Sequence, residues 1–286
     1  MLKLKKKAPP LTPDAQMELI DHLAELRTRL FRAALYVVVG MVVTYRFFPE
    51  FLTLLKHPIQ PYIDKKLIEV VFTNLPEAFL LRLQVSFLSG LAAASPFVIM
   101  ELWGFVSPAL TPQERRPVLF LAPFSILLFL SGIGTGYASL PMAYQWMFSY
   151  VGDIPDARLF QNAQQYILLT VKILLAFGVS YQLPIVLLFL ARVGLINAEM
   201  MVKYWRHAVV GISAAAAILT PSNDPLTMLM MAVPMAGLYA LSISLVRAFE
   251  PKPDGSRSLS FATMLFVALA PVGLLAAVGY WLWRAG

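Results

Sequence analysis

The sequence contains no cysteine and only three histidines among its 286 residues. Without cysteine the chain cannot form disulfides, zinc–thiolate sites, iron–sulfur clusters or a thiol nucleophile. His22, His57 and His207 are far apart in the sequence, and no His-Glu-x-x-His pattern, Gly-x-Ser-x-Gly elbow or glycine-rich phosphate loop is present. We therefore predict that the protein is not an enzyme, and we expect neither a metal ion nor a cofactor.

Charged residues are also scarce. They make up 14% of the chain, whereas soluble domains contain about 25%. Hydrophobic residues make up 59%, and the mean hydropathy is +0.70. Because a water-soluble fold of this length cannot bury so much apolar surface, a bilayer must solvate it. Backbone amides in hydrocarbon must be paired within the structure, and the apolar runs are continuous rather than alternating. Both features favour an all-α integral membrane protein over a barrel.

Seven apolar segments are candidate transmembrane helices, since about 20 apolar residues cross a hydrocarbon core of about 30 Å. They cover residues 30–48, 78–100, 117–137, 166–191, 208–220, 226–246 and 261–283. The fifth segment is too short for a full crossing, and a proline-flanked turn at residues 221–225 joins it to the sixth. We expect both of these helices to be short and to form a re-entrant or shallow hairpin.

The distribution of lysine and arginine predicts the orientation. Fifteen of the 23 lie in residues 1–32, 101–116, 192–206 and 247–260, which alternate with loops that hold few. The positive-inside rule places this set in the cytoplasm. The net charge of +7 does not indicate nucleic-acid binding, because no basic stripe with interleaved aromatics is present. The N-terminal basic run is followed by prolines rather than an apolar core, which does not fit a cleavable signal peptide.

These patterns divide the chain into four parts. Residues 1–29 form a cytoplasmic basic and amphipathic segment, and residues 30–247 form a membrane domain of six helices. Residues 248–260 are a cytoplasmic linker, and residues 261–286 contain an additional transmembrane helix. Seven crossings place the two termini on opposite sides, so with the N-terminus in the cytoplasm the C-terminus is expected on the outer side.

Two acidic positions lie at the predicted cytoplasmic edge of the membrane. Glu25 precedes the first span, and Glu114 lies in the aromatic- and proline-rich loop between the second and third spans. Two interpretations remain open. Each carboxylate either pairs locally, Glu25 with Arg29 one helical turn away and Glu114 with the arginines that follow it, or has a functional role at the membrane surface.

A family resemblance begins at the first of these positions. Residues 22–30, HLAELRTRL, resemble the HLxELRxRL motif of TatC proteins, the multi-spanning receptors of the twin-arginine protein translocase. Similar fragments follow in the family's order: Pro96, Trp103, FVSPAL at 105–110, ERR at 114–116, FGVSYQLP at 177–184, LTP at 219–221, Asp224 and VPM at 233–235. The resemblance covers residues 17–247 and implies six helices in a concave, glove-like arrangement. The seventh helix is a departure from the usual family count.

The resemblance implies a receptor in the bacterial cytoplasmic (inner) membrane. TatC proteins bind twin-arginine signal peptides of folded cargo at their cytoplasmic face. They work in an oligomeric complex with single-span TatA- and TatB-type subunits, and the proton-motive force drives export. Carboxylates suit this task because guanidinium groups form forked, charge-assisted hydrogen bonds with them. The matched positions for peptide binding are Glu25 and Glu114, together with Phe105, Arg27 and Arg116 in the same motifs; for Phe105, packing is the alternative role.

Four further positions match the family pattern. We expect Pro58 to serve packing and Pro96 to kink its helix, whereas Asp224 either caps the sixth helix or has a functional role. Gln182 stands where the family often has glutamate, and since an amide does not titrate, we expect it to contact a partner helix instead. The alternative function is a secondary transporter, in which polar residues near the membrane midplane would bind a small solute or ion.

Overall fold

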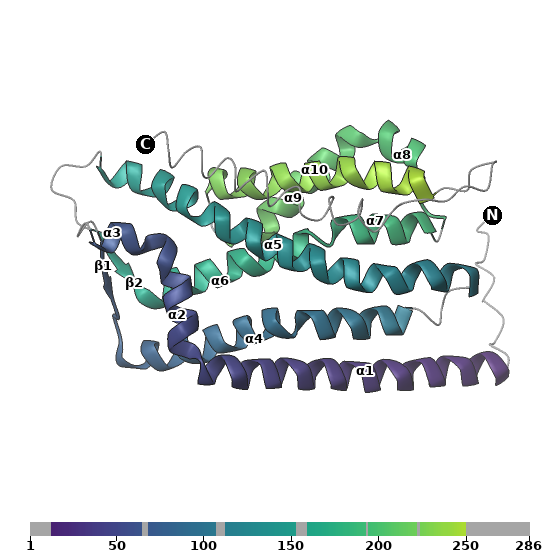
Figure 1. Cartoon of the computed structure of the whole chain (residues 1–286), viewed down its shortest axis with the longest axis horizontal. Helices are drawn as coiled ribbons and strands as arrows, with labels where there is room; N and C mark the ends of the chain where they lie inside the picture. Colours follow the sequence, from purple (N-terminus) through teal and green to yellow (C-terminus); the bar gives the residue numbers. More distant parts are fainter. Residues whose placement is uncertain are drawn as a thin grey trace, which may run out of the picture.

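The computed structural model describes residues 13–64, 68–106, 112–152, 159–192, 194–221 and 224–249. The predicted seventh helix lies outside these residues, as do the basic N-terminal run and nearly all of the predicted linker. The longer helices are α1 (Pro13–Arg46), α4 (Leu75–Val106), α5 (Pro112–Gly152), α6 (Ala163–Ser180), α7 (Leu183–Arg192), α9 (Trp205–Leu219) and α10 (Pro225–Phe249). The shorter elements are α2 (Phe48–Lys56), η1 (His57–Ile59), α3 (Gln60–Asp64), α8 (Ala198–Lys203), β1 (Ile68–Val71) and β2 (Leu159–Asn162). Most of the long helices follow the long axis of the molecule, and α5 crosses it obliquely (Figure 1).

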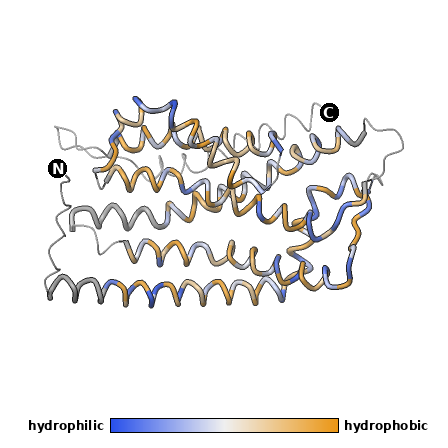
Figure 2. The backbone as a smooth tube through the Cα atoms, turned by 180° about the vertical axis from the view of Figure 1, so that it is seen from behind, coloured by the Kyte–Doolittle hydropathy of each residue, from blue (hydrophilic) through white to orange (hydrophobic). Residues whose placement is uncertain are grey.

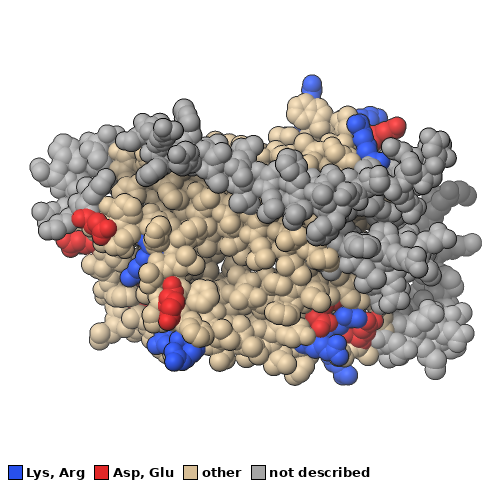
Figure 3. All heavy atoms as spheres, in the orientation of Figure 1, with Lys and Arg blue, Asp and Glu red and all other residues tan. Residues whose placement is uncertain are grey.

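The arrangement fits a protein that spans a membrane. Within the described residues, four helical segments are long and apolar enough to cross: Leu75–Phe105, Pro123–Tyr150, Ala163–Ala191 and Pro225–Arg247. Helix α1 and the segment after it form a fifth candidate, bent by 80°, and α9 is a shorter apolar helix. Charged side chains gather towards the two ends of the face in Figure 3 and leave its middle uncharged. The hydrophilic parts in Figure 2 lie mainly around α3 and the strands at one end and α8 at the other.

The predicted short pair of helices is only half right. Helix α9 has 15 residues and spans about 22 Å, so the expectation of a short fifth helix is confirmed. Helix α10 has 25 residues and reaches about 37 Å, enough for a full crossing. The expectation of a short sixth helix is therefore wrong. Pro225 at the first helical position has no N–H that needs a partner, and helix continues beyond the last purely apolar residues to Phe249.

Prolines explain where two of the crossing segments break. Pro49 stands near the start of α2, directly after the bend that ends α1. Pro184 follows the turn at Tyr181 and Gln182 that separates α6 from α7. The helix breaks here because proline has no N–H to donate and its ring clashes with the preceding turn. Pro96, by contrast, lies inside α4 without ending it.

Helices α1 and α4 run antiparallel and pack side by side (Figure 1). Their backbones touch at Gly40 and Gly90, where a Cβ on Gly40 would lie 2.5 Å from the Gly90 carbonyl oxygen. Only glycine permits this approach. The pairing fixes the register between the two helices and so determines which side chains meet at their ends.

At the other end of the molecule, β1 and β2 form a parallel pair in which Ile68 lies opposite Leu159 and Val71 opposite Asn162. This small sheet joins the segments before α4 and α6. The sequence analysis predicted neither strand, because each has only four residues and such a run has no clear alternating pattern.

Candidate functional site

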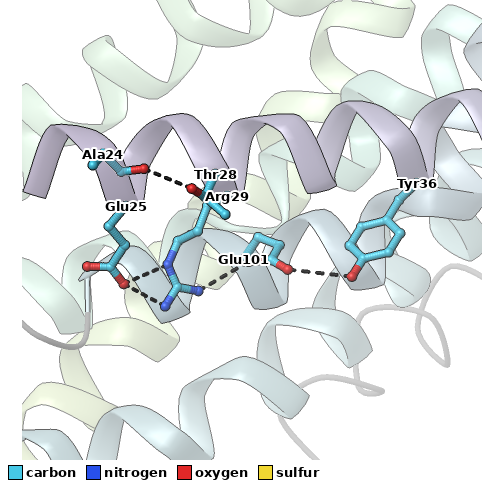
Figure 4. A network of polar contacts seen from close by, with 6 residues as sticks. All are labelled: Ala24, Glu25, Thr28, Arg29, Tyr36 and Glu101. Carbon is cyan, nitrogen blue, oxygen red and sulfur yellow. Dashed lines mark hydrogen bonds and ion pairs between the residues drawn. The ribbon is translucent and has the colours of Figure 1, made fainter. Parts of the chain in front are cut away.

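The two ion pairs recorded in the described part of the chain are both made by Arg29. Its Nε and Nη2 donate to Oε1 of Glu25 at 2.9 and 2.7 Å, and its Nη1 donates to Oε2 of Glu101 at 3.1 Å (Figure 4). The other oxygen of Glu101 accepts a long contact of 3.5 Å from the Tyr36 hydroxyl. One guanidinium therefore connects a carboxylate on its own helix to a carboxylate on α4.

Local geometry explains this arrangement. Glu25 and Arg29 are four residues apart on α1 and so lie on one helical face. Glu101 joins them because α4 packs against the same face. Gly104 leaves room for the guanidinium, since a Cβ at that position would overlap Arg29 Nη1. Arg29 thus lies directly against the α4 backbone.

The network is graded in its exposure to solvent. The side chain of Glu101 is 13% exposed, that of Arg29 25% and that of Glu25 33%. An open depression of about 390 Å³ adjoins the outer part of the network and is lined by Ala24, Glu25, Thr28, Arg29 and Arg32. Fully exposed ion pairs contribute only about 0–1 kcal/mol to stability. The Glu25 carboxylate borders this depression and is the most accessible carboxylate of the network.

The structure places part of the predicted peptide-binding set at this end. Glu25 belongs to the network, and its predicted pairing with Arg29 is present. The Phe105 ring stacks on His22, with ring centroids 4.4 Å apart and an interplanar angle of 16°, which fastens the end of α4 to α1. Arg27 is exposed on α1.

Glu114 and Arg116 lie in the first turns of α5, but their side chains are outside the described residues. The start of α5 lies at the same end of the molecule as the start of α1 and the end of α4 (Figure 1). The predicted proximity of the Glu114 and Glu25 carboxylates remains a prediction.

Sequence analysis missed Glu101. The predicted second span ended at residue 100, which assigned this glutamate to the loop, whereas α4 continues to Val106. The signal was available, because an acidic residue at the end of an apolar span requires a partner. Its partner, Arg29, is 72 residues away in the sequence, so pairing rules for neighbouring residues do not find it.

Gln182 lies at the break between α6 and α7 and binds helix α5. Its Oε1 accepts a hydrogen bond of 2.5 Å from the Ser125 hydroxyl, and its Nε2 donates to the Ser125 carbonyl at 3.0 Å. Beside it is a groove of about 330 Å³ between α4, α5 and α7, lined by Ile99, Leu102, Trp103, Ser125, Gln182, Ile185, Val186 and Phe189. The lining is apolar except for the Gln182–Ser125 pair. The predicted contact with a partner helix is not tested by this arrangement.

The remaining predicted positions have structural roles. Pro58 is buried in η1, as expected for packing. Asp224 caps α10: its Oδ1 accepts a hydrogen bond of 2.8 Å from the Thr227 N–H, and its Oδ2 accepts one from the Thr227 hydroxyl. The capping interpretation of Asp224 is therefore realised in the structure.

Fold and site together define a multi-pass α-helical membrane protein. Its carboxylate–guanidinium network lies between the first half of α1 and the last turns of α4. Residues 21–234 match the family model described as "Sec-independent protein translocase protein (TatC)". The chain belongs to the TatC family.

Relatives and solved structures agree with this assignment. The chain is 36% identical over 252 residues to a Sec-independent protein translocase protein TatC of Deinococcus radiodurans, covering 86% of this chain and 90% of the relative. It is 37% identical over 235 residues to one of Desulforapulum autotrophicum, covering 82% and 86%. A crystal structure of a "Twin Arginine Translocase Receptor- TatC in DDM" superimposes with a TM-score of 0.69 at 30% identity, covering 79% of this chain and 99% of the other. These findings support a translocase and not the alternative, a secondary transporter.

Proposed function

We propose that this protein is the core receptor of a twin-arginine translocase and that it binds twin-arginine signal peptides with the Glu25 end of its helices. The observation that carries the proposal is the position of Glu25, a one-third exposed carboxylate at the edge of an open depression. Membership of the TatC family and the likeness to a crystallised twin-arginine translocase receptor support it. The positive-inside pattern predicts that this end faces the cytoplasm.

The chemistry of the site suits an arginine-containing ligand. A guanidinium presents a planar fork of N–H donors to a carboxylate, whereas the lysine ammonium is a compact point charge that cannot form the same paired bonds. Glu25 supplies one carboxylate, and Glu114 at the start of α5 is the proposed second one. Arg27, Arg116 and Phe105 are proposed to border the peptide, since they belong to the same helix ends.

The same proposal includes a multi-subunit machine. Single-span partner subunits pack against the membrane face of the receptor. The groove beside Gln182, which is apolar except for the Gln182–Ser125 pair, is the proposed place for such a helix. A Gln side chain has two N–H donors and one carbonyl acceptor, so Gln182 can still bind a partner helix after pairing with Ser125. The assembly resides in the bacterial cytoplasmic membrane and uses the proton-motive force to export folded proteins.

Peptide binding tests this function. The full-length protein in lipid nanodiscs is titrated with a labelled twin-arginine signal peptide and with its twin-lysine variant. We expect Glu25→Gln to weaken binding of the twin-arginine peptide by about tenfold, because a charge-assisted pair is worth about 1.5–3 kcal/mol. Glu199→Gln, which removes another carboxylate, in the first turn of α8, is the matched control and should bind normally. Equal affinity for the two peptides in the wild-type protein would reject the proposal.

A further inference from the structure

We infer that Arg29 is a resident guanidinium that shares Glu25 with the incoming signal arginine, and that Glu101 is the positioning residue that holds Arg29 during this exchange. The inference rests on the proposed function and adds two residues to it. It explains how a carboxylate that is already paired in the resting protein can accept a second guanidinium.

The first observation is that Arg29 uses only half of Glu25. Both of its hydrogen bonds to this side chain end on Oε1, and the second oxygen points away from Arg29 (Figure 4). A carboxylate has about four lone-pair sites on its two oxygens. Glu25 can therefore begin to bind an incoming guanidinium through Oε2 before it loses Arg29.

The second observation is that Arg29 has another anchor. Its Nη1 is bonded to Glu101, the least exposed member of the network. When Glu25 turns towards a ligand, Arg29 stays paired with Glu101. Without Glu101, releasing Glu25 would leave the Arg29 charge unpaired in a partly buried position, which is unfavourable.

The third observation is the charge balance. The network contains two carboxylates and one guanidinium, and hence one net negative charge. An incoming guanidinium makes the balance two to two. Arg32 also lines the depression, but it is exposed and solvent and salt screen its charge, whereas Glu101 is largely shielded from both.

The fourth observation is that the fold makes room for Arg29. Gly104 allows Nη1 to lie against the α4 backbone, where any Cβ would collide with the guanidinium. Gly104→Ala should therefore force Arg29 Nη1, the atom that is bonded to Glu101, to move, and it changes no charge. This substitution provides a geometric counterpart to Glu101→Gln.

A double-mutant cycle tests the exchange with the nanodisc assay and the labelled twin-arginine peptide. Glu101→Gln leaves Arg29 with Glu25 as its sole carboxylate in the network, so Arg29 competes fully with the peptide. We expect about a tenfold loss of affinity, close to the lower limit for one charge-assisted hydrogen bond. In an Arg29→Gln background this competitor is gone, and Glu101→Gln should change the affinity less than about twofold. A merely structural role of Glu101 would give the same loss in both backgrounds.

Gly104→Ala provides an arm that keeps every charge. We expect it to reproduce the Glu101→Gln loss, and the Glu101→Gln/Gly104→Ala double variant should bind no more weakly than either single one. This arm decides the question if Arg29→Gln does not fold. An equal Glu101→Gln loss with and without Arg29, additive losses for the Glu101→Gln/Gly104→Ala pair, or no loss in Glu101→Gln would each overturn the inference. Unaltered binding by Glu25→Gln would instead reject the assignment of the peptide site itself.

Discussion

At the level of single residues, several polar side chains inside this apolar molecule are hydrogen-bonded to partners that fix their direction. The Tyr181 hydroxyl donates to Thr135 Oγ1 at 2.9 Å, and Tyr144 and Thr170 share a hydrogen bond of 2.8 Å. Such groups cost free energy when buried alone and little when paired. Arg29 differs from them because its partners are two charged groups at the edge of the membrane domain, one of which is accessible.

Polar pairs between residues that are close in the sequence could be predicted from the sequence, and pairs between distant residues could not. The Glu25–Arg29 pair follows from helical spacing alone. The Arg29–Glu101 and Gln182–Ser125 contacts depend on which helices are neighbours and in which register, and a single sequence contains no measure of that. Asp224 is an intermediate case, because its position before Pro225 allowed a cap without excluding a further role.

Substitution of Asp224 separates those two roles. If capping is its function, Asp224→Asn should keep both stability and transport, since asparagine caps equally well. Asp224→Ala should lower the free energy of unfolding by about 1 kcal/mol. Thermal unfolding in detergent and export of a reporter protein measure the two effects. A stable Asp224→Asn variant that fails to export would show that the carboxylate acts beyond the cap.

At the scale of elements, hydropathy predicts most of the helices because lipid imposes a simple rule: backbone groups must be paired within each crossing segment. The breaks before α2 and α7 follow from Pro49 and Pro184. The elements that were missed lie outside this rule. The strands β1 and β2 are short and lie at one end of the molecule (Figure 1), and the length of α10 depends on residues beyond its apolar run.

The α1–α4 contact is an element-scale feature with a direct test. A Cβ on Gly90 would overlap the Met41 backbone nitrogen, so Gly90→Ala should separate the helices and cost about 1–3 kcal/mol through overpacking. The measurement is the apparent Tm of the purified protein. Gly134→Ala in α5 is the control, because nothing lies within 4 Å of its Cβ position, and alanine there favours the helix. Equal Tm values for the two variants would contradict the close approach.

In the molecule as a whole, the candidate binding site lies where helix ends come together. The start of α1, the end of α4 and the start of α5 come together at one end, and the small β1–β2 sheet lies at the other (Figure 1). The distribution of lysine and arginine predicts which end faces the cytoplasm. The apolar run at residues 261–283, which the structure does not describe, predicts one more crossing of the membrane.

The lack of native cysteine makes this orientation directly measurable. A single cysteine introduced at Ala285 should react with an impermeant maleimide added outside intact cells, because the seven crossings predicted from the sequence would place this residue on the outer side. A single cysteine at Ala15 should react only after the membrane is opened, which makes it the control. Protection of the Ala285 cysteine in intact cells would show that the last apolar segment does not cross.

The proposed receptor function requires that the Glu25 carboxylate of α1 faces the cytoplasm and recognises the arginines of an export signal. The most direct test measures peptide binding to membrane vesicles of known orientation that contain wild-type protein or the Glu25→Gln variant. We expect the twin-arginine peptide to bind only to vesicles that expose the cytoplasmic face, and to bind better than its twin-lysine variant. Glu25→Gln should abolish this preference. An unchanged preference in Glu25→Gln, or binding from the opposite face, would contradict the proposed function.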